Sequence, residues 1–209
     1  MSLTSLLVAN RGEIAVRILR AAMEAGLRTT SVYSEDDIDA LHVRMADESR
    51  RLPGAGSESY LNAPLIVEEA RAAGCEAIHP GYGFLSERSD FALLCEQNDL
   101  LFVGPTAEHL RLFGDKLAAR AHASACGVPV ASGTSDSTSL EECQNFFESL
   151  GQDAAILIKA VAGGGGRGIR EVRDVDEIPS AYERCCSEAL RSFGNDAVYV
   201  ERVIDHARH

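Results

Sequence analysis

The sequence has 209 residues, of which 45% are hydrophobic and 25% charged, and its formal net charge is −12. This balance is typical of a globular protein and excludes a disordered tail or a repeat array. A nucleic-acid binder needs a basic face, and the longest basic stretch is the pair Arg50-Arg51, so no nucleic-acid partner is expected. No apolar run approaches the ~20 residues that span a bilayer, so no membrane partner is expected either.

The first five residues, Met1 to Ser5, lack the basic and apolar segments of a signal peptide. We therefore expect a cytoplasmic protein, while a mitochondrial matrix location stays open for a longer parent chain. The six cysteines show no C-x-x-C spacing, so they are expected to be small buried thiols in a reducing compartment.

The first half of the chain alternates short apolar segments with amphipathic ones. Residues 6–9 and 29–33 are predicted strands, and the helix between them starts at Glu13 and stops at Gly26. Further strands are expected at 49–52, 76–78 and 100–103, and further helices at 41–45, 62–73 and 89–97. Strands that alternate with helices in this way predict a mainly parallel sheet with helices on its faces.

The second half of the chain follows a different pattern. The predicted order is a helix at 106–125, a linker-like stretch at 130–138, a helix at 140–150, strands at 155–160 and 169–172, a helix at 175–190 and a strand at 197–203. Two consecutive strands followed by a helix and a strand favour a small antiparallel α+β unit. We therefore predict two domains, residues 1–113 and 114–209.

A glycine run at residues 163–168, with Arg167 inside it, joins the two consecutive strands. Glycine permits positive φ and close approach of a ligand to main-chain N–H groups, which can form an anion-binding concavity. The run leads from strand to strand rather than into a helix, so it predicts a hairpin that folds over a nucleotide. Lys159, at the end of the first strand, needs an anionic partner, and a triphosphate would provide one. The alternative is a mobile surface hairpin.

Five motifs occur in order along the chain. They are Val8-Ala9-Asn10-Arg11-Gly12-Glu13-Ile14-Ala15, His79-Pro80-Gly81-Tyr82-Gly83, Gly114-Asp115-Lys116, the glycine hairpin and Val198-Tyr199-Val200-Glu201. With these motifs the chain resembles the biotin carboxylase component of biotin-dependent carboxylases, which have the ATP-grasp fold. The resemblance implies an α/β fold class, with an N-terminal Rossmann-like (pre-ATP-grasp) domain and a small α+β lid at about 131–203. It also implies that the C-terminal lobe of the ATP-grasp domain is absent.

The resemblance implies an ATP site in which Lys116 and Lys159 contact the phosphates. The lid residues expected to close over the phosphates are Gly163, Gly164, Gly165, Gly166, Arg167 and Gly168. Glu201 is expected to bind the adenine amino group, and the residues expected beside the rest of the nucleotide are Arg202, Ile204 and His209. Tyr82 is expected near the biotin site. Two departures from the family pattern are Ala162, where a glycine is usual, and Arg202, where a lysine is usual.

The implied reaction uses ATP, bicarbonate and Mg²⁺, with Mn²⁺ as a possible substitute. Bicarbonate attacks the γ-phosphate to give carboxyphosphate and ADP, and the CO₂ released from carboxyphosphate carboxylates biotin on a carrier protein. A carboxyltransferase component and a second copy of the chain, as a homodimer, are the other implied partners. The catalytic residues and the metal ligands are expected in the missing lobe, so this chain, as a fragment, is expected to be inactive by itself.

Several alternatives stay open at this stage. Another ATP-grasp ligase, such as a carbamoyl phosphate synthetase half, would share the lid, and a non-catalytic dimerisation module would share the fold. A nicotinamide-dependent oxidoreductase should show G-x-G-x-x-G after the first strand, which this chain lacks. Locally, Asn10 and Glu13 could form a capping box, residues 79–82 could be only a tight turn, and Lys116 and Glu201 could simply face water.

Overall fold

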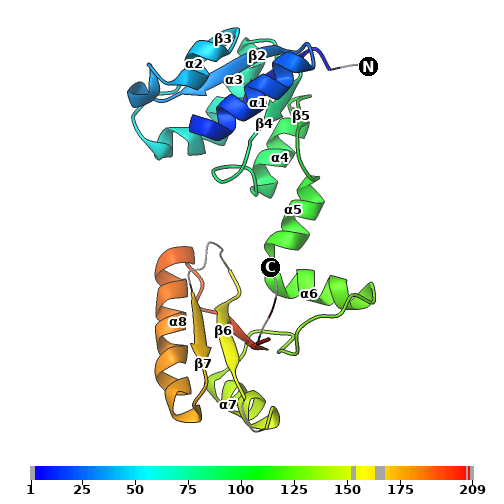
Figure 1. The fold of residues 1–209 in the computed structure, drawn as a ribbon, viewed down its shortest axis with the longest axis vertical. Helices are drawn as coiled ribbons and strands as arrows, with labels where there is room; N and C mark the ends of the chain where they lie inside the picture. Colours follow the sequence, from blue (N-terminus) through cyan, green and yellow to red (C-terminus); the bar gives the residue numbers. More distant parts are fainter. Residues whose placement is uncertain (1–2, 152–153, 163–167, 206, 208–209) are drawn as a thin grey trace. The chain divides into compact units, whose positions relative to one another are not determined.

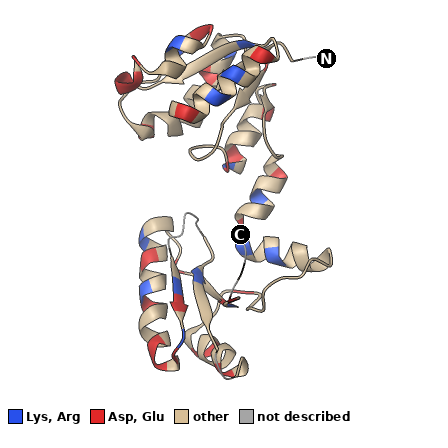
Figure 2. Ribbon diagram, in the orientation of Figure 1, with Lys and Arg blue, Asp and Glu red and all other residues tan. Residues whose placement is uncertain are grey.

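The computed structural model describes residues 3–151, 154–162, 168–205 and 207. The chain divides into two compact units, Met1–Arg111 and Leu112–His209. No helix within the described stretches is long and apolar enough to cross a membrane. Acidic and basic residues are interspersed along helices such as α1 and α8, as the red and blue segments of the ribbon in Figure 2 show.

The first unit is built on a parallel five-stranded sheet with the order β3-β2-β1-β4-β5. Its strands are β1 (Ser5–Val8), β2 (Arg28–Tyr33), β3 (Glu48–Arg51), β4 (Ala77–His79) and β5 (Leu101–Phe102). Its helices are α1 (Gly12–Glu24), α2 (Leu41–Met45), α3 (Ala63–Ala72) and α4 (Ser89–Glu96), with short 3-10 turns η1 (Glu35–Asp37) and η2 (Ser57–Leu61). The predicted parallel α/β fold is confirmed.

Alternation along β1 explains how helices cover both faces of this sheet. Leu7 packs in a core with residues of α3 and α4, whereas Leu6 and Val8 pack in a second core with residues of α1. On α1 the buried residues are Ala15, Ile18, Leu19 and Ala22, which repeat at helical spacing. The sheet is therefore buried between two helical layers (Figure 1).

The second unit is built on an antiparallel three-stranded sheet with the order β7-β6-β8. The strands are β6 (Ile156–Ala160), β7 (Ile169–Val172) and β8 (Val198–Arg202). Its helices are α6 (Lys116–Ala125), α7 (Leu140–Ser149) and α8 (Ile178–Phe193), preceded by the turn η3 (Val175–Glu177), while α5 (Ala107–Gly114) runs across the division between the units. The predicted small antiparallel unit is confirmed.

One face of this sheet forms the core of the second unit. Ile156, Ile158 and Val200 are fully buried against α7 and α8, together with Cys143 and Cys185 (Figure 1). The neighbouring positions on the strands face the other way, and on that face Leu157 lies opposite Glu201 and Lys159 lies opposite Tyr199. Two charged residues of the predicted site, Lys159 and Glu201, therefore share the face that α7 and α8 do not cover.

One local prediction was wrong and another was incomplete. The helix predicted at 106–125 is two helices, because Asp115 has extended backbone angles and its carboxylate accepts the N–H groups of Leu117 and Ala118 as an N-cap. The stretch at 130–138 is more than a linker, because Gly133 forms a β-bridge with Glu201 along the edge of β8.

The structure excludes the alternative in which Asn10 caps the first helix. Arg11 occupies the N-cap position, and its side chain makes no capping hydrogen bond. The Asn10 amide donates instead to the carbonyl oxygens of Pro80 at 2.7 Å and Tyr82 at 2.9 Å. A long-range contact has replaced the local one that the capping-box alternative assumed.

Candidate active site

The site is centred on Glu201, near the end of β8. Its side chain is only 10% exposed, and each carboxylate oxygen has a cationic partner. Lys159 on β6 donates to Oε2, and Arg120 on α6 donates to Oε1 at 2.5 Å. We call Lys116, Arg120, Lys159 and Glu201 the Glu201 cluster.

Arg120 was not anticipated from the sequence. Besides Glu201, its guanidinium donates to the carbonyl oxygen of Ala131 at 2.7 Å, and its side chain is 19% exposed. A sequence signal was present, because Arg120 lies four residues after Lys116 and therefore projects from the same side of α6. The partner on β8, 81 positions further along the chain, could not be read from that spacing.

Lys116 is the first residue of α6, directly after the cap at Asp115. Burial lowers the pKa of its ammonium, the positive charge of Lys159 lowers the pKa further, and the charge of Asp115 opposes both effects. The two lysines therefore lie within electrostatic reach of each other. They are also the only two lysines in the sequence, in which the other Lys and Arg residues are all arginines.

The base of the glycine hairpin is closed by main-chain contacts. The N–H of Ala160 donates to the carbonyl oxygen of Gly168 at 2.7 Å, and Cys185 contacts the same oxygen with its sulfur at 3.1 Å. Gly168 has a φ of +66°, and a Cβ there would lie 2.8 Å from the Cβ of Ala160. Glycine is therefore required at this end of the loop, while residues 163–167, also predicted for the site, lie outside the described residues.

A strip of backbone extends the sheet beside β8. The N–H of Arg202 donates to Ser132 at 2.8 Å, and the N–H of Thr134 donates to Val200 at 3.0 Å. Between them, a Cβ on Gly133 would lie 2.5 Å from the carbonyl oxygen of Val200. The main-chain N–H of Arg202 is thus used inside the fold.

Ile204 and His209, which follow β8, were also predicted to lie beside the nucleotide. Ile204 is exposed, with 62% of its surface accessible. His209 lies outside the described residues.

In the first unit, two motifs separated by about 70 residues meet at Tyr82. The Tyr82 hydroxyl donates to the Glu13 carboxylate, and this hydrogen bond raises the pKa of the phenol. Gly81 has a φ of +69°, and a Cβ there would lie 2.8 Å from the Asn10 amide nitrogen. The turn at residues 79–82 is therefore fitted to the Asn10 side chain, and it leaves Tyr82 61% exposed.

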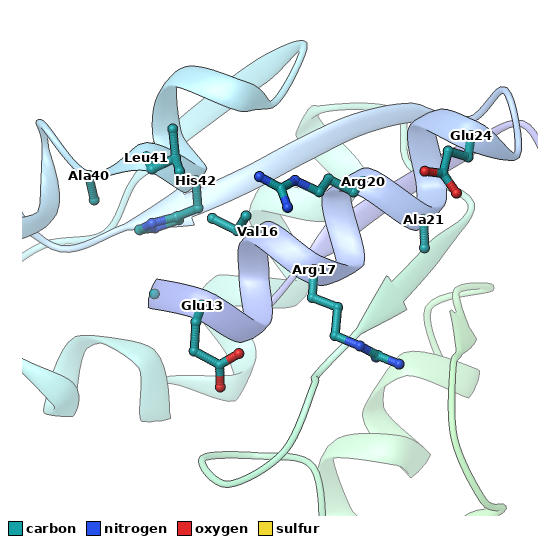
Figure 3. Close-up of a pocket in the computed structure, with 10 residues that line it drawn as sticks. Glu13, Val16, Arg17, Arg20, Ala21, Glu24, Ala40, Leu41 and His42 are labelled. Carbon is teal, nitrogen blue, oxygen red and sulfur yellow. The ribbon is translucent and has the colours of Figure 1, made fainter.

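A cavity of about 690 Å³ lies between α1 and α2 in the first unit (Figure 3). Its lining includes Arg17, Arg20, Glu24 and the buried His42. In Figure 3 the Arg17 and Arg20 side chains extend from α1 in different directions, so they do not converge on one anion. Among the described residues, none of those predicted to bind nucleotide lines this cavity.

A magnesium site was expected to need carboxylates from elsewhere. Among the described residues, no group of three or more His, Cys, Asp or Glu side chains is placed to hold a metal ion. Glu201, the one carboxylate at the centre of the cluster, is occupied by two cations. The donor set of the described residues does not fit a complete Mg²⁺ site.

Comparison with protein families gives two adjoining matches. Residues 2–110 match the model described as biotin carboxylase, N-terminal domain, and residues 115–209 match the model described as carbamoyl-phosphate synthase L chain, ATP binding domain. The second model is named after carbamoyl-phosphate synthase, the alternative ATP-grasp ligase considered from the sequence. The relatives that match across nearly the whole chain nevertheless favour the carboxylase reading over the carbamoyl phosphate synthetase alternative.

Biotin carboxylase 1 of Bacillus subtilis is 47% identical over 206 residues, which are 98% of this chain and 45% of that protein. A solved biotin carboxylase from Campylobacter jejuni, in a β-γ-ATP complex, has a TM-score of 0.93 and 41% identity over 98% of this chain and 46% of that one. The biotin carboxylase domain dimer of the Hydrogenobacter thermophilus 2-oxoglutarate carboxylase, with MgADP, ADP and bicarbonate, has a TM-score of 0.89 and 41% identity over 98% of this chain and 45% of that one.

The chain thus spans less than half the length of each of these three relatives. The biotin carboxylase model alone matches more than half of the chain, and the similarity to the carboxylases continues through the second unit. The chain therefore belongs to the biotin carboxylase family.

Proposed function

We propose that this chain forms the nucleotide-binding part of an ATP-dependent ligase, a biotin carboxylase. The observation that carries the proposal is the Glu201 cluster. Lys159 lies next to the base of the glycine hairpin, and Lys116, the other lysine of the sequence, lies within electrostatic reach of it. The two ammonium groups repel each other, and a triphosphate supplies several negative oxygens that both can bind at once.

In this proposal Lys116 and Lys159 bind the phosphates, and residues 163–168 fold over them. Glu201 accepts the adenine amino group, and the base and ribose lie against residues 202–204 and His209. Tyr82, from the first unit, lies near biotin. The support for these roles is the position of the matching motifs and the relatives whose solved structures hold adenine nucleotides.

The proposed reaction of the whole protein is the carboxylation of biotin. Bicarbonate oxygen attacks the γ-phosphorus of ATP, the bond to the β-phosphate oxygen breaks, and carboxyphosphate and ADP result. Carboxyphosphate then releases CO₂ and phosphate, and N1 of biotin, after losing its proton, takes up the CO₂. A lid that excludes water would protect carboxyphosphate from hydrolysis.

The partners proposed for the whole protein follow from the same reaction. They are MgATP, bicarbonate, biotin on a carrier protein or domain, a carboxyltransferase component and a second copy as a homodimer. The Hydrogenobacter thermophilus domain is described as a dimer, which supports the last of these. We also propose a cytoplasmic location.

The test is a calorimetric titration of MgATP and MgADP into this chain. Lys159→Ala should weaken MgATP binding at least about tenfold, equivalent to about 1.4 kcal/mol. Arg184→Ala is the matched control, because it removes an exposed cation on α8, outside the cluster. Equal affinity of the wild type and Lys159→Ala would refute the phosphate role, and a wild type without saturable binding would contradict the proposal that the chain forms this site by itself.

A further inference from the structure

The two cations that hold Glu201 are anchored differently. Arg120 donates to Glu201 and also to the carbonyl oxygen of Ala131, so its guanidinium is fixed at two points. The contacts described for Lys159 give its ammonium one hydrogen-bond acceptor, Glu201. An ammonium has three donors, so Lys159 can turn to a new acceptor while Arg120 stays in place.

The charges around the cluster are unequal in number. Two cations, Arg120 and Lys159, share the carboxylate of Glu201, and a third cation, Lys116, lies within electrostatic reach of Lys159. Asp115 lies beside Lys116, with one oxygen engaged in capping α6. Glu201 is 10% exposed, so it cannot rely on water if a partner leaves. Whatever takes Lys159 away from Glu201 must leave another cation on that carboxylate.

We propose that Glu201 is a built-in counter-anion that occupies Lys159 until a polyphosphate arrives, and that Arg120 is the positioning residue that keeps Glu201 compensated and in place after Lys159 turns to the phosphates. This inference rests on the proposed function, because it assigns Lys159 to the phosphates. It adds a competition between Glu201 and the phosphates for one ammonium, and it gives Arg120 a role.

The competition predicts the direction of each substitution on the binding of inorganic tripolyphosphate, which has no base. Glu201→Gln should strengthen this binding about tenfold, because Lys159 is no longer occupied. Arg120→Met should weaken it about tenfold, because Glu201 then holds Lys159 more strongly, and Arg120→Lys should restore part of the loss. The double variant Arg120→Met/Glu201→Gln should bind at least as tightly as the wild type.

Two controls separate this mechanism from general effects. Glu188→Gln changes the net charge by the same amount, but its partner is Arg170 at 2.7 Å, so tripolyphosphate affinity should not change. If Arg120 merely supported the fold, the double variant would bind as weakly as Arg120→Met. That result, or equal strengthening by Glu188→Gln, would overturn the inference.

A second readout requires no ligand. Because the chain has two lysines, selective ¹⁵N-lysine labelling gives two side-chain ammonium signals, one for Lys116 and one for Lys159. Glu201→Gln should shift the Lys159 signal, whereas Arg120→Met should retain the ion-paired signal. An unchanged Lys159 signal in Glu201→Gln refutes the inference. If the signal shifts as expected but the chain binds neither tripolyphosphate nor MgATP, the proposed function is refuted, while the ion pair between Lys159 and Glu201 still stands.

Discussion

Replacement of Asp37 by Asn should destabilise the first unit in a pH-dependent way. Asp37 ends the turn η1 with its side chain 9% exposed. The Arg11 guanidinium donates to both carboxylate oxygens at 2.5 Å, and the Tyr60 hydroxyl donates to one of them at 2.7 Å. Asn keeps the shape but removes the charge, so the bidentate pair with Arg11 is lost while Tyr60 retains an acceptor.

The magnitude follows from the protonation equilibrium. The hydrogen bonds from Arg11, then those from Tyr60, lower the pKa of Asp37 from 3.8 to about 2, against the opposing effect of burial. At ~1.36 kcal/mol per pKa unit, ionised Asp37 contributes about 2 kcal/mol to the free energy of unfolding. Because the folded-state pKa is the lower one, this contribution is complete above pH 3.8 and is lost as the pH falls towards 2.

The assay must report on each unit separately, and the sequence contains no tryptophan. Buried cysteines serve instead: Cys75 and Cys95 belong to the first unit, and Cys143 and Cys185 to the second. Labelling with 4,4′-dithiodipyridine across a urea series, read by mass spectrometry, gives an unfolding free energy for each unit.

Asp37→Asn should shift the labelling of Cys75 and Cys95 and leave that of Cys143 and Cys185 unchanged. Asp39→Asn, an exposed change two positions away, is the control and should shift neither pair. The difference between wild type and Asp37→Asn should shrink as the pH falls from 5 to 3. A loss below about 0.5 kcal/mol at pH 7, or one that is independent of pH, would refute the reasoning.

Two further predictions use the same labelling assay. His42 is fully buried, neither ring nitrogen has a hydrogen-bond partner among the described residues, and burial lowers its pKa below 6.5 while the charge of Asp37 opposes this shift. Protons therefore bind the unfolded chain more strongly than the folded one, so the first unit should lose stability as the pH falls below 6.5. His42→Leu should remove that loss. The same dependence of stability on pH in the wild type and the variant would contradict this prediction. Ile158→Ala, in the core of the second unit, should cost about 3 kcal/mol and expose Cys143 at lower urea, and an equal shift of Cys95 would contradict the independence of the units.

Much of the fold could be predicted from local patterns. The alternation of apolar segments with amphipathic ones predicted a parallel sheet for the first unit, and two strands joined by a glycine run predicted the antiparallel hairpin. These patterns are readable because burial imposes the period of each element on its own sequence. Helix ends were less clear, since the stop and cap at Gly114-Asp115 lie inside an otherwise helical stretch.

The sequence alone determined the parallel and antiparallel sheets, the glycine hairpin and the two lysines, because each depends on neighbouring residues or on a short motif. Only the tertiary structure decided which side chains meet. It placed the Asn10 amide on the turn at residues 80–82 rather than on its own helix, and it brought Arg120 to Glu201 across 81 positions. Such contacts depend on how separate elements pack, and a polar side chain takes the partner that packing leaves within hydrogen-bond distance.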